Sequence, residues 1–443
     1  IIVWFPTLGT SSISFLLSTG VVPPPYTVFK NLFKIGQGIK CKLLECNKKV
    51  KISFSEINIF SKSLERKKFD ESIFLEMIFK NIKKNLVSDI PTYLFQSAGK
   101  DSNLIALAYS IHCENKNSLT CLTYGSVDDE TLYAKNISNK LGFKHINLII
   151  PKYSTNKFTN LIQDNLKNTF FPNTDNAYLG YFLYNDGFLN QKNNLIDGMG
   201  NDIYSGHIPS FNEYIMQHSS KLFSKFNFLS NYTDSLLLDE ITKSKVFYTG
   251  LYGLPNFISK KIYSKYVDQR KFFENKYDFV DDYFLIRAKI RGGIIDYEKF
   301  MGKLQSFSFS NRSNVIFPFA QKNVGEYVFN TSQKLLYSKI FLKNKIFIRK
   351  ILEKHLNLEK NKVGKKTFRF DYWKNILNYE EYVYYEILNC KLFNKSKIVE
   401  TVEQLKKISN SRSITRNRCR ALLNYLFQIS IWYNHSKYID RDI

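Results

Sequence analysis

Apolar segments and helical segments alternate between residues 92 and 197. Short apolar runs recur roughly every 25 residues, and segments with helical patterning separate them. This alternation is typical of βαβ units, so we predict an α/β fold in which helices flank a parallel sheet. The strands are expected at 92–96, 119–124, 145–150 and 194–197, and the helices at 102–112, 130–141 and 157–168. Ligands of such sheets bind outside the carboxyl ends of the strands, so chemistry is expected in the loops after residues 96, 124 and 197.

The N-terminal region has a different pattern. Short apolar runs and turn residues predict a small β region over residues 26–60, with strands at 26–29 and 51–54 and a turn at 36–38. Residues 64–86 predict a helix, because their apolar side chains follow helical spacing. After residue 215 the chain is rich in helix-like periodicity, and we expect a helical C-terminal part.

Composition narrows the possible partners. The 443 residues suffice for two or three domains. Lys and Arg number 64 against 39 Asp and Glu, which gives a net charge of +25 and favours polyanionic partners. The basic residues are scattered along the chain rather than gathered in one patch, so we expect no nucleic-acid partner.

Cysteine and histidine usage argues against a structural metal site. None of the six cysteines forms a CxxC pair, and the six histidines form no HxxxH motif. Reduced thiols are typical of a cytoplasmic protein. Residues 1–25 carry no charge but contain Pro6, Gly9 and Gly20, so we expect no membrane span.

The strongest chemical signal follows the first predicted strand of the sheet. This segment reads Gln96-Ser97-Ala98-Gly99-Lys100-Asp101-Ser102. Small residues let the backbone approach a phosphate closely, and the N–H groups at a helix start attract anions. Lys100 adds positive charge, whereas Asp101 suits phosphate binding only with Mg²⁺ between them. Because Asp101 follows Gly99-Lys100, the segment is not a Walker A loop.

Six segments in order resemble the asparagine synthetase family of the pyrophosphatase-loop superfamily. The loop just described is similar to the family's Ser-Gly-Gly-x-Asp-Ser signature. The other five are Ser88-Asp89-Ile90-Pro91, Leu122-Thr123-Tyr124-Gly125 with Asp129-Glu130, Ala134, Leu141-Gly142 and His145, Gly198-Met199-Gly200-Asn201-Asp202 with Ser205-Gly206-His207, Phe317-Pro318-Phe319, and Gly364-Lys365-Lys366-Thr367-Phe368. Residues 16–30 resemble the tail of that family's glutaminase domain.

The resemblance implies two domains. Residues 1–62 would be the incomplete tail of a glutaminase-like domain, and residues 63–443 a synthetase domain with an α/β core at about 88–210 and a helical part at about 211–443. The family's glutaminase begins with a nucleophilic Cys, whereas residue 1 here is Ile. We therefore expect no glutaminase step in this chain, with nitrogen supplied by ammonia, an amine or a separate glutaminase subunit.

The resemblance also implies a mechanism and its residues. A substrate carboxylate attacks ATP to give an acyl-adenylate and pyrophosphate, and ammonia or an amine then displaces AMP. Asp101 and Asp202 match the acids that hold Mg²⁺. Lys365, or the adjacent Lys366, matches the catalytic lysine that stabilises developing negative charge. The remaining implied ATP- and pyrophosphate-binding residues are Ser97, Ala98, Gly99, Lys100, Ser102, Leu122, Gly125, Gly198 and Gly200.

Several positions depart from the family pattern. Met199 stands where asparagine synthetases carry Glu, and a methionine cannot move a proton. Ile203 replaces a second Glu, Ala98 replaces a Gly, and Gln321 replaces an Asp. The half of the site that adenylates the acid is kept, whereas the half that accepts the amine is altered.

We therefore expect an ATP-dependent, AMP-forming amide ligase that adenylates aspartate or a related acid and transfers nitrogen to it. One alternative is amidation of a sugar acid or a peptide carboxylate in surface-polysaccharide or peptide biosynthesis. A second is a tRNA-modifying pyrophosphatase-loop enzyme, which the positive charge would suit. A third is an inactive remnant of the fold.

Overall fold

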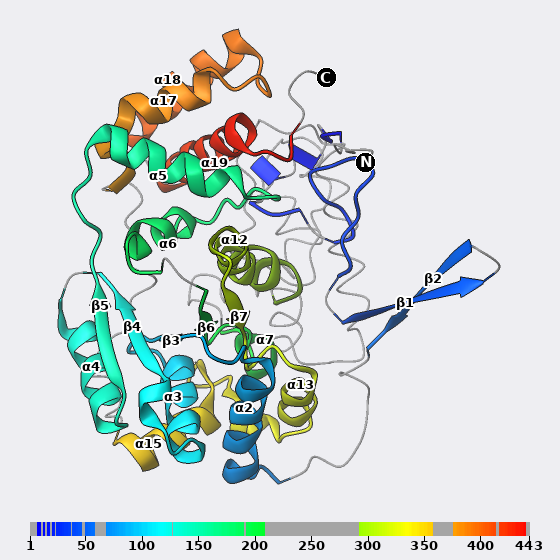
Figure 1. The fold of residues 1–443 in the computed structure, drawn as a ribbon, viewed down its shortest axis with the longest axis vertical. Helices are drawn as coiled ribbons and strands as arrows, with labels where there is room; N and C mark the ends of the chain where they lie inside the picture. The colour runs from blue at the N-terminus through cyan, green and yellow to red at the C-terminus, as the bar shows by residue number, and fades with distance from the viewer. Residues whose placement is uncertain are drawn as a thin grey trace.

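The computed structural model describes residues 7–57, 68–208, 292–357 and 375–439, with short gaps inside these ranges at 10–11, 14–15, 18–19, 23, 37, 47–48, 126, 190–191 and 413–415. A five-stranded parallel sheet lies at its centre (Figure 1). Its strand order is β5-β4-β3-β6-β7. The strands are β3 (Thr92–Phe95), β4 (Thr120–Tyr124), β5 (Lys144–Leu148), β6 (Asn194–Ile196) and β7 (Asn314–Ile316). The predicted fold class is confirmed.

Helices cover both faces of the sheet (Figure 1). One face packs against α2 (Glu71–Asn85), α3 (Lys100–His112), α13 (Lys322–Phe329) and α15 (Ile346–Leu356). The other packs against α5 (Thr155–Lys167), α6 (Tyr178–Asn185), α12 (Gly302–Asn311) and α19 (Arg416–His435). The remaining helices are α4 (Asp129–Lys140), α7 (Asp202–Ser205), α14 (Gln333–Leu336), α17 (Glu380–Leu388) and α18 (Lys395–Ser409), the 3-10 turns η1 (Lys116–Ser118) and η4 (Leu377–Tyr379), and the π-helix η3 (Gly292–Met301).

The strands divide their side chains between two hydrophobic cores. Leu94 packs into the core with α2 and α3, whereas its neighbour Phe95 packs into the core with α6 and α12. Cys121 and Leu122 divide in the same way. Successive side chains of a strand point to opposite faces, and in a sheet covered on both faces each side must be apolar. This explains why the strands are short continuous apolar runs.

The first helix of this region begins later than the sequence predicts. Residues 68–70 are not helical, and α2 begins at Glu71 inside the predicted range 64–86. The side chain of Asp70 accepts a hydrogen bond from the backbone N–H of Ile73 at 3.0 Å. An N-cap residue has extended backbone angles, as Asp70 does with φ −112° and ψ 120°, so the helix cannot extend through it.

The C-terminal part is not purely helical. Strand β7 comes from it and completes the sheet beside β6, and a two-stranded ribbon joins β8 (Tyr337–Ser338) to β9 (Lys343–Asn344). These strands have only two or three residues, too few for an alternating pattern to be recognisable. The segment 209–291, which includes much of the predicted helical part, lies outside the described residues.

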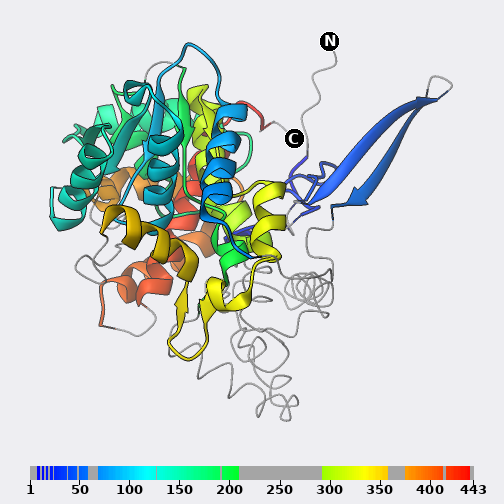
Figure 2. The same ribbon diagram turned by 90° about the horizontal axis from the view of Figure 1, so that it is seen from below.

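The N-terminal β region is a hairpin that projects from the body (Figure 2). It pairs β1 (Ile39–Cys46) with β2 (Lys49–Glu56) in antiparallel register. The predicted strand 51–54 lies inside β2, but 26–29 forms only an isolated bridge from Phe29 to Leu8. Ile13, Leu16, Val22, Val28 and Phe29 instead pack against α19, where Trp432 is fully buried. Among the described residues, no helix combines the length and apolar character that crossing a bilayer requires.

The cap at Asp70 provides a test of the α2 boundary. Asp70→Ala removes the acceptor for the Ile73 N–H, and we expect a loss of about 1 kcal/mol in the free energy of unfolding. Urea denaturation measures the loss. Asp164→Ala, at an exposed position within α5, is the matched control and should leave the midpoint unchanged. Equal midpoints for wild type and Asp70→Ala would contradict this assignment of the cap.

We expect His145, on β5, to make the stability of the fold depend on pH. Burial, assisted by the positive charge of Lys135, lowers the pKa of His145 to about 4, whereas an unfolded histidine titrates near 6.5. The unfolded state therefore binds the proton at higher pH. The stabilising contribution is complete above about pH 6.5 and is lost as the pH falls toward 4. We expect the urea midpoint to fall over this window, and His145→Gln to flatten the fall. An unchanged slope in the variant would disprove the assignment to His145.

Candidate functional site

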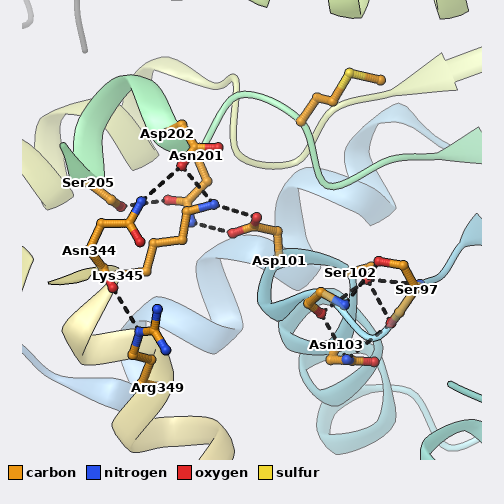
Figure 3. Close-up of polar contacts among 12 residues, drawn as sticks. Ser97, Asp101, Ser102, Asn103, Asn201, Asp202, Ser205, Asn344, Lys345 and Arg349 are labelled. Carbon is orange, nitrogen blue, oxygen red and sulfur yellow. Dashed lines mark hydrogen bonds and ion pairs between the residues drawn. The ribbon is translucent and has the colours of Figure 1, made fainter. Parts of the chain in front are cut away.

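The loop from Gln96 to Gly99 joins β3 to α3 and folds back on its own hydroxyl groups (Figure 3). Ser97 Oγ accepts a hydrogen bond from the Gly99 N–H at 3.0 Å. The Ser97 N–H donates to Ser102 Oγ at 3.3 Å. These contacts turn the chain tightly between strand and helix, so that the loop lies at the carboxyl edge of the sheet, where ligands of such folds bind.

Asn103 supports this loop from below. It is fully buried, and its amide donates to the Gly99 carbonyl at 2.8 Å and to the Ser97 carbonyl at 3.2 Å (Figure 3). Its Oδ1 accepts from Gln96 Nε2 at 2.8 Å, and Ser138 in turn donates to Gln96. With all of these groups paired, the loop is held in one conformation. The sequence analysis missed Asn103, because a buried asparagine has no periodic signal.

The start of α3 provides donors for an anion. Gly99 is the N-cap residue and makes no side-chain cap hydrogen bond. The first N–H groups of a helix have no partner within the helix, and the helix dipole adds partial positive charge there. The structure brings the predicted loop residues together at this helix start. They are Ser97, Ala98, Gly99, Lys100 and Ser102. Their binding of pyrophosphate stays a prediction.

Asp101 and Asp202 come together around one cation, the ammonium of Lys345 (Figure 3). Lys345 Nζ lies 2.5 Å from Asp101 Oδ2 and 2.9 Å from Asp202 Oδ1. The ammonium side chain is 7% exposed, so water screens these contacts little. Burial by itself lowers the pKa of Lys345, but the two carboxylates outweigh it and hold that pKa above its usual value. Lys345 is therefore charged at neutral pH.

A second layer of amides fixes the two acids. Asn201 donates to Asp101 Oδ1 at 2.7 Å and accepts from Ser205 Oγ at 2.9 Å. Asn344 donates to Asp202 Oδ1 at 3.4 Å, and Arg349 donates to the Asn344 carbonyl at 2.9 Å (Figure 3). The β6 loop, the β9 strand and the start of α15 thus converge on the loop after β3.

Two predicted glycines allow the loops to approach this closely. A Cβ atom at Gly198 would lie 3.0 Å from Asp101 Cβ and 3.1 Å from the Ser102 nitrogen. Gly200 has a φ of +100°, and a Cβ there would lie 3.0 Å from Ala320 Cβ. A larger residue at position 198 would push the β6 loop away from the start of α3, and one at position 200 would push it away from the segment after β7. Gly198 and Gly200 therefore allow close packing of the loops, and their contact with ATP stays a prediction.

A magnesium ion bound by both acids would need the position of the Lys345 ammonium. Mg²⁺ lies about 2.0–2.1 Å from its oxygen ligands. Both oxygens of Asp101 already accept hydrogen bonds, one from Asn201 and one from Lys345. In this arrangement, Asp101 and Asp202 fit an ammonium between them and not a metal ion held by both side chains. Within the described ranges, no group of three or more His, Cys, Asp or Glu gathers to hold a metal ion. The Mg²⁺ site stays a prediction, and we derive no step through it.

The other predicted residues are placed as follows. Leu122 is fully buried in the core against α6, and Gly125 follows β4 with its N–H donating to the Leu148 carbonyl at 3.0 Å. Met199 packs partly buried on the same core, and its N–H donates to Asp197 Oδ1 at 2.8 Å. Lys365 and Lys366 lie outside the described residues. Lys345 was missed, because one lysine before an amphipathic helix resembles any surface lysine.

Comparisons with known proteins establish no family. No family model matches the sequence, and no curated protein matches it. Among solved structures, the chain is similar to the U34-tRNA thiolase NcsA from Methanococcus maripaludis with its 4Fe–4S cluster, at a TM-score of 0.19 and 14% identity over 53% of this chain and 79% of that chain. A TM-score of 0.19 establishes neither a shared fold nor a shared function. The asparagine synthetase resemblance stays a prediction from the motifs.

Loss of the Lys345 ammonium is expected to destabilise the fold strongly. Lys345→Met leaves two neighbouring carboxylates without their cation, and we expect a loss of about 3–5 kcal/mol in the free energy of unfolding. Chemical denaturation measures it. Lys350→Met, an exposed position on the same helix, is the matched control. A variant as stable as wild type would show that the ammonium does not hold the site together.

Proposed function

We propose that this chain binds ATP at the loop 96–102 and uses it to adenylate a carboxylate, releasing pyrophosphate. The activated acid is then converted to an amide by a nitrogen nucleophile. The acid is aspartate or a related acid, with sugar acids and peptide carboxylates as the next candidates. We retain as part of this proposal the division into residues 1–62 and a synthetase domain from residue 63.

One observation carries the proposal. The loop after β3 presents a tightly turned serine-rich backbone and an uncapped helix start, and the only ion cluster that the described residues form around it is Asp101–Lys345–Asp202. Anion-binding N–H groups at a sheet edge are the chemistry that a polyphosphate requires, and the cluster fixes the geometry of the loop that carries them. The motif order in the sequence points to the same substrate.

The chemistry of the first step follows from these groups. A substrate carboxylate oxygen attacks the α-phosphorus and forms the acyl–phosphate bond, while the bond from the α-phosphorus to the bridging oxygen breaks. That oxygen leaves with the pyrophosphate, and its new negative charge develops at the loop. The N–H groups at the start of α3 and the Ser97 and Ser102 hydroxyls stabilise this charge, because they are fixed before the reaction begins. The Asn103 network is what keeps them fixed.

The second step needs a group that takes a proton from the nitrogen nucleophile. Met199 cannot do so. Asp197 ends the same strand, and its Oδ1 accepts the Met199 N–H. Burial first, and then the charges of Asp197 and Tyr184, raise the pKa of Tyr124 well above its usual value, although the hydrogen bond with Asn185 lowers it. We assign the proton-accepting role to Asp197 as part of the proposed function.

The test measures the two steps separately. Carboxylate-dependent exchange of pyrophosphate into ATP reports adenylation, and amide formation with ammonium chloride reports the complete reaction. Aspartate is run beside sugar acids and peptide acids, and beside tRNA without added acid. Exchange with an acid supports the proposal. Exchange that requires tRNA would replace it with RNA adenylation, and a chain that binds no ATP by thermal shift would be the inactive remnant.

Variants of the acids predict different losses in the two steps. Asp202→Asn weakens the Lys345 cluster at the loop, and we expect pyrophosphate exchange to fall about 100-fold. Asp197→Asn removes only the proton acceptor, so amide formation should fall at least about tenfold while exchange persists. Asp164→Asn, on an exposed part of α5, is the control for both. Equal losses of both steps in Asp197→Asn would remove that residue from the second step.

A further inference from the structure

A cavity of about 450 Å³ lies between the N-terminal segment, the loop before α6, and the helices η3 and α12. It shares none of its lining residues with the loops 96–102 and 197–202 or with Lys345. The cavity is therefore separate from the proposed ATP site. Pockets that bind small molecules fall in this range of volume.

Most of the cavity wall is apolar and aromatic. Phe170 and Phe171 contact each other at right angles with ring centroids 4.7 Å apart, and Tyr297 and Phe309 face them from η3 and α12. Val21 and Val22 line the side formed by the N-terminal segment. A ligand that fills this space therefore needs an apolar body.

Three neutral polar side chains of the wall are already paired with the protein. Thr27 Oγ1 donates to the Leu32 carbonyl at 2.7 Å, and Thr174 Oγ1 donates to the Gly20 carbonyl at 2.7 Å. Asn173 Oδ1 accepts the Asp175 N–H at 2.8 Å. These groups shape the cavity, but they leave recognition of a ligand to the charged pair on its wall.

That pair is Lys34 and Glu298, and neither side chain is fully satisfied. Lys34 Nζ donates to the Val22 carbonyl at 2.7 Å and to Glu298 Oε2, which uses two of the three N–H bonds of an ammonium. Glu298 Oε1 is buried and has no hydrogen-bond partner among the described residues. Burial raises the pKa of Glu298 in spite of the attraction of Lys34. A buried carboxylate oxygen without a donor is costly, so this site lacks one hydrogen-bond donor.

We propose that this cavity binds a free α-amino acid with a large apolar side chain. Its carboxylate takes the third N–H of Lys34, its ammonium donates to Glu298 Oε1, and its side chain lies against Phe170, Phe171 and Tyr297.

The charge balance selects the zwitterion over simpler ligands. Lys34 and Glu298 sum to zero, so a ligand with an amine alone would leave a net positive charge in the cavity, and an acid alone would leave a net negative charge. Uncompensated charge in a buried site is strongly unfavourable. An amino acid completes an alternating ring of two cations and two anions.

Calorimetric titration of the full chain tests the proposal without any variant. L-phenylalanine, L-leucine and L-tryptophan are compared with N-acetyl-L-phenylalanine, L-phenylalanine amide and glycine. We expect at least one of the first three to bind, and the blocked and side-chain-free compounds to bind at least about tenfold more weakly. Absence of binding by all three amino acids would overturn the proposal, as would unimpaired binding of either blocked compound.

Variants then locate the binding site. Glu298→Gln keeps the shape of the side chain and Lys34→Met removes the ammonium, and each should weaken binding at least about tenfold. Lys30→Met and Glu403→Gln, at exposed positions away from the cavity, should bind as wild type does. ATP-induced thermal shift should persist in all four variants, which separates this site from the proposed ATP site. Unchanged amino-acid binding in folded Glu298→Gln would place the ligand elsewhere.

Discussion

The buried ammonium of Lys345 holds together three segments that lie far apart in the sequence. Asp101 starts α3, Asp202 starts α7, and Lys345 precedes α15. Removing the ammonium would leave the buried Asp101 carboxylate without its cation, and that penalty is larger than the gain from forming the pair. The cluster therefore acts mainly as a constraint on geometry. It fixes the β6 loop against the β3 loop, and that contact creates the site.

The two edges of the sheet have different roles. At the amino edge, Asn194 is fully buried, donates to the Val87 carbonyl at 3.0 Å and accepts from Asn314 Nδ2 at 2.8 Å. These bonds join the starts of β6 and β7 to the segment before β3, and they serve stability. At the carboxyl edge, hydroxyls, amides and charges face one another around an open helix start. The same kind of side chain thus stabilises one edge and prepares the other for a ligand.

Much of the fold was predictable because its signals are local. The strand and helix ranges between 92 and 197 agree with the structure to within two residues at most ends, since apolar runs and helical periodicity are properties of neighbouring residues. The predicted start of α2 was wrong, because the side chain of Asp70 caps the helix and residues 68–70 are not helical. Strand β7 was missed, because its three residues are defined by the partner strand and not by their own sequence.

The sequence by itself determined the α/β class, the order of the strands along the chain and the position of the phosphate-type loop after the first strand of the sheet. These depend on hydrophobic periodicity and on small residues between a strand and a helix, which are visible in a short window. Only the tertiary structure decided that Lys345 lies between Asp101 and Asp202, that Asn103 braces the loop, and that Lys34 and Glu298 share a cavity wall. The two ion pairs join residues that are far apart in the sequence, and the Asn103 contacts depend on how the loop turns. None of these contacts leaves a periodic signal in the chain.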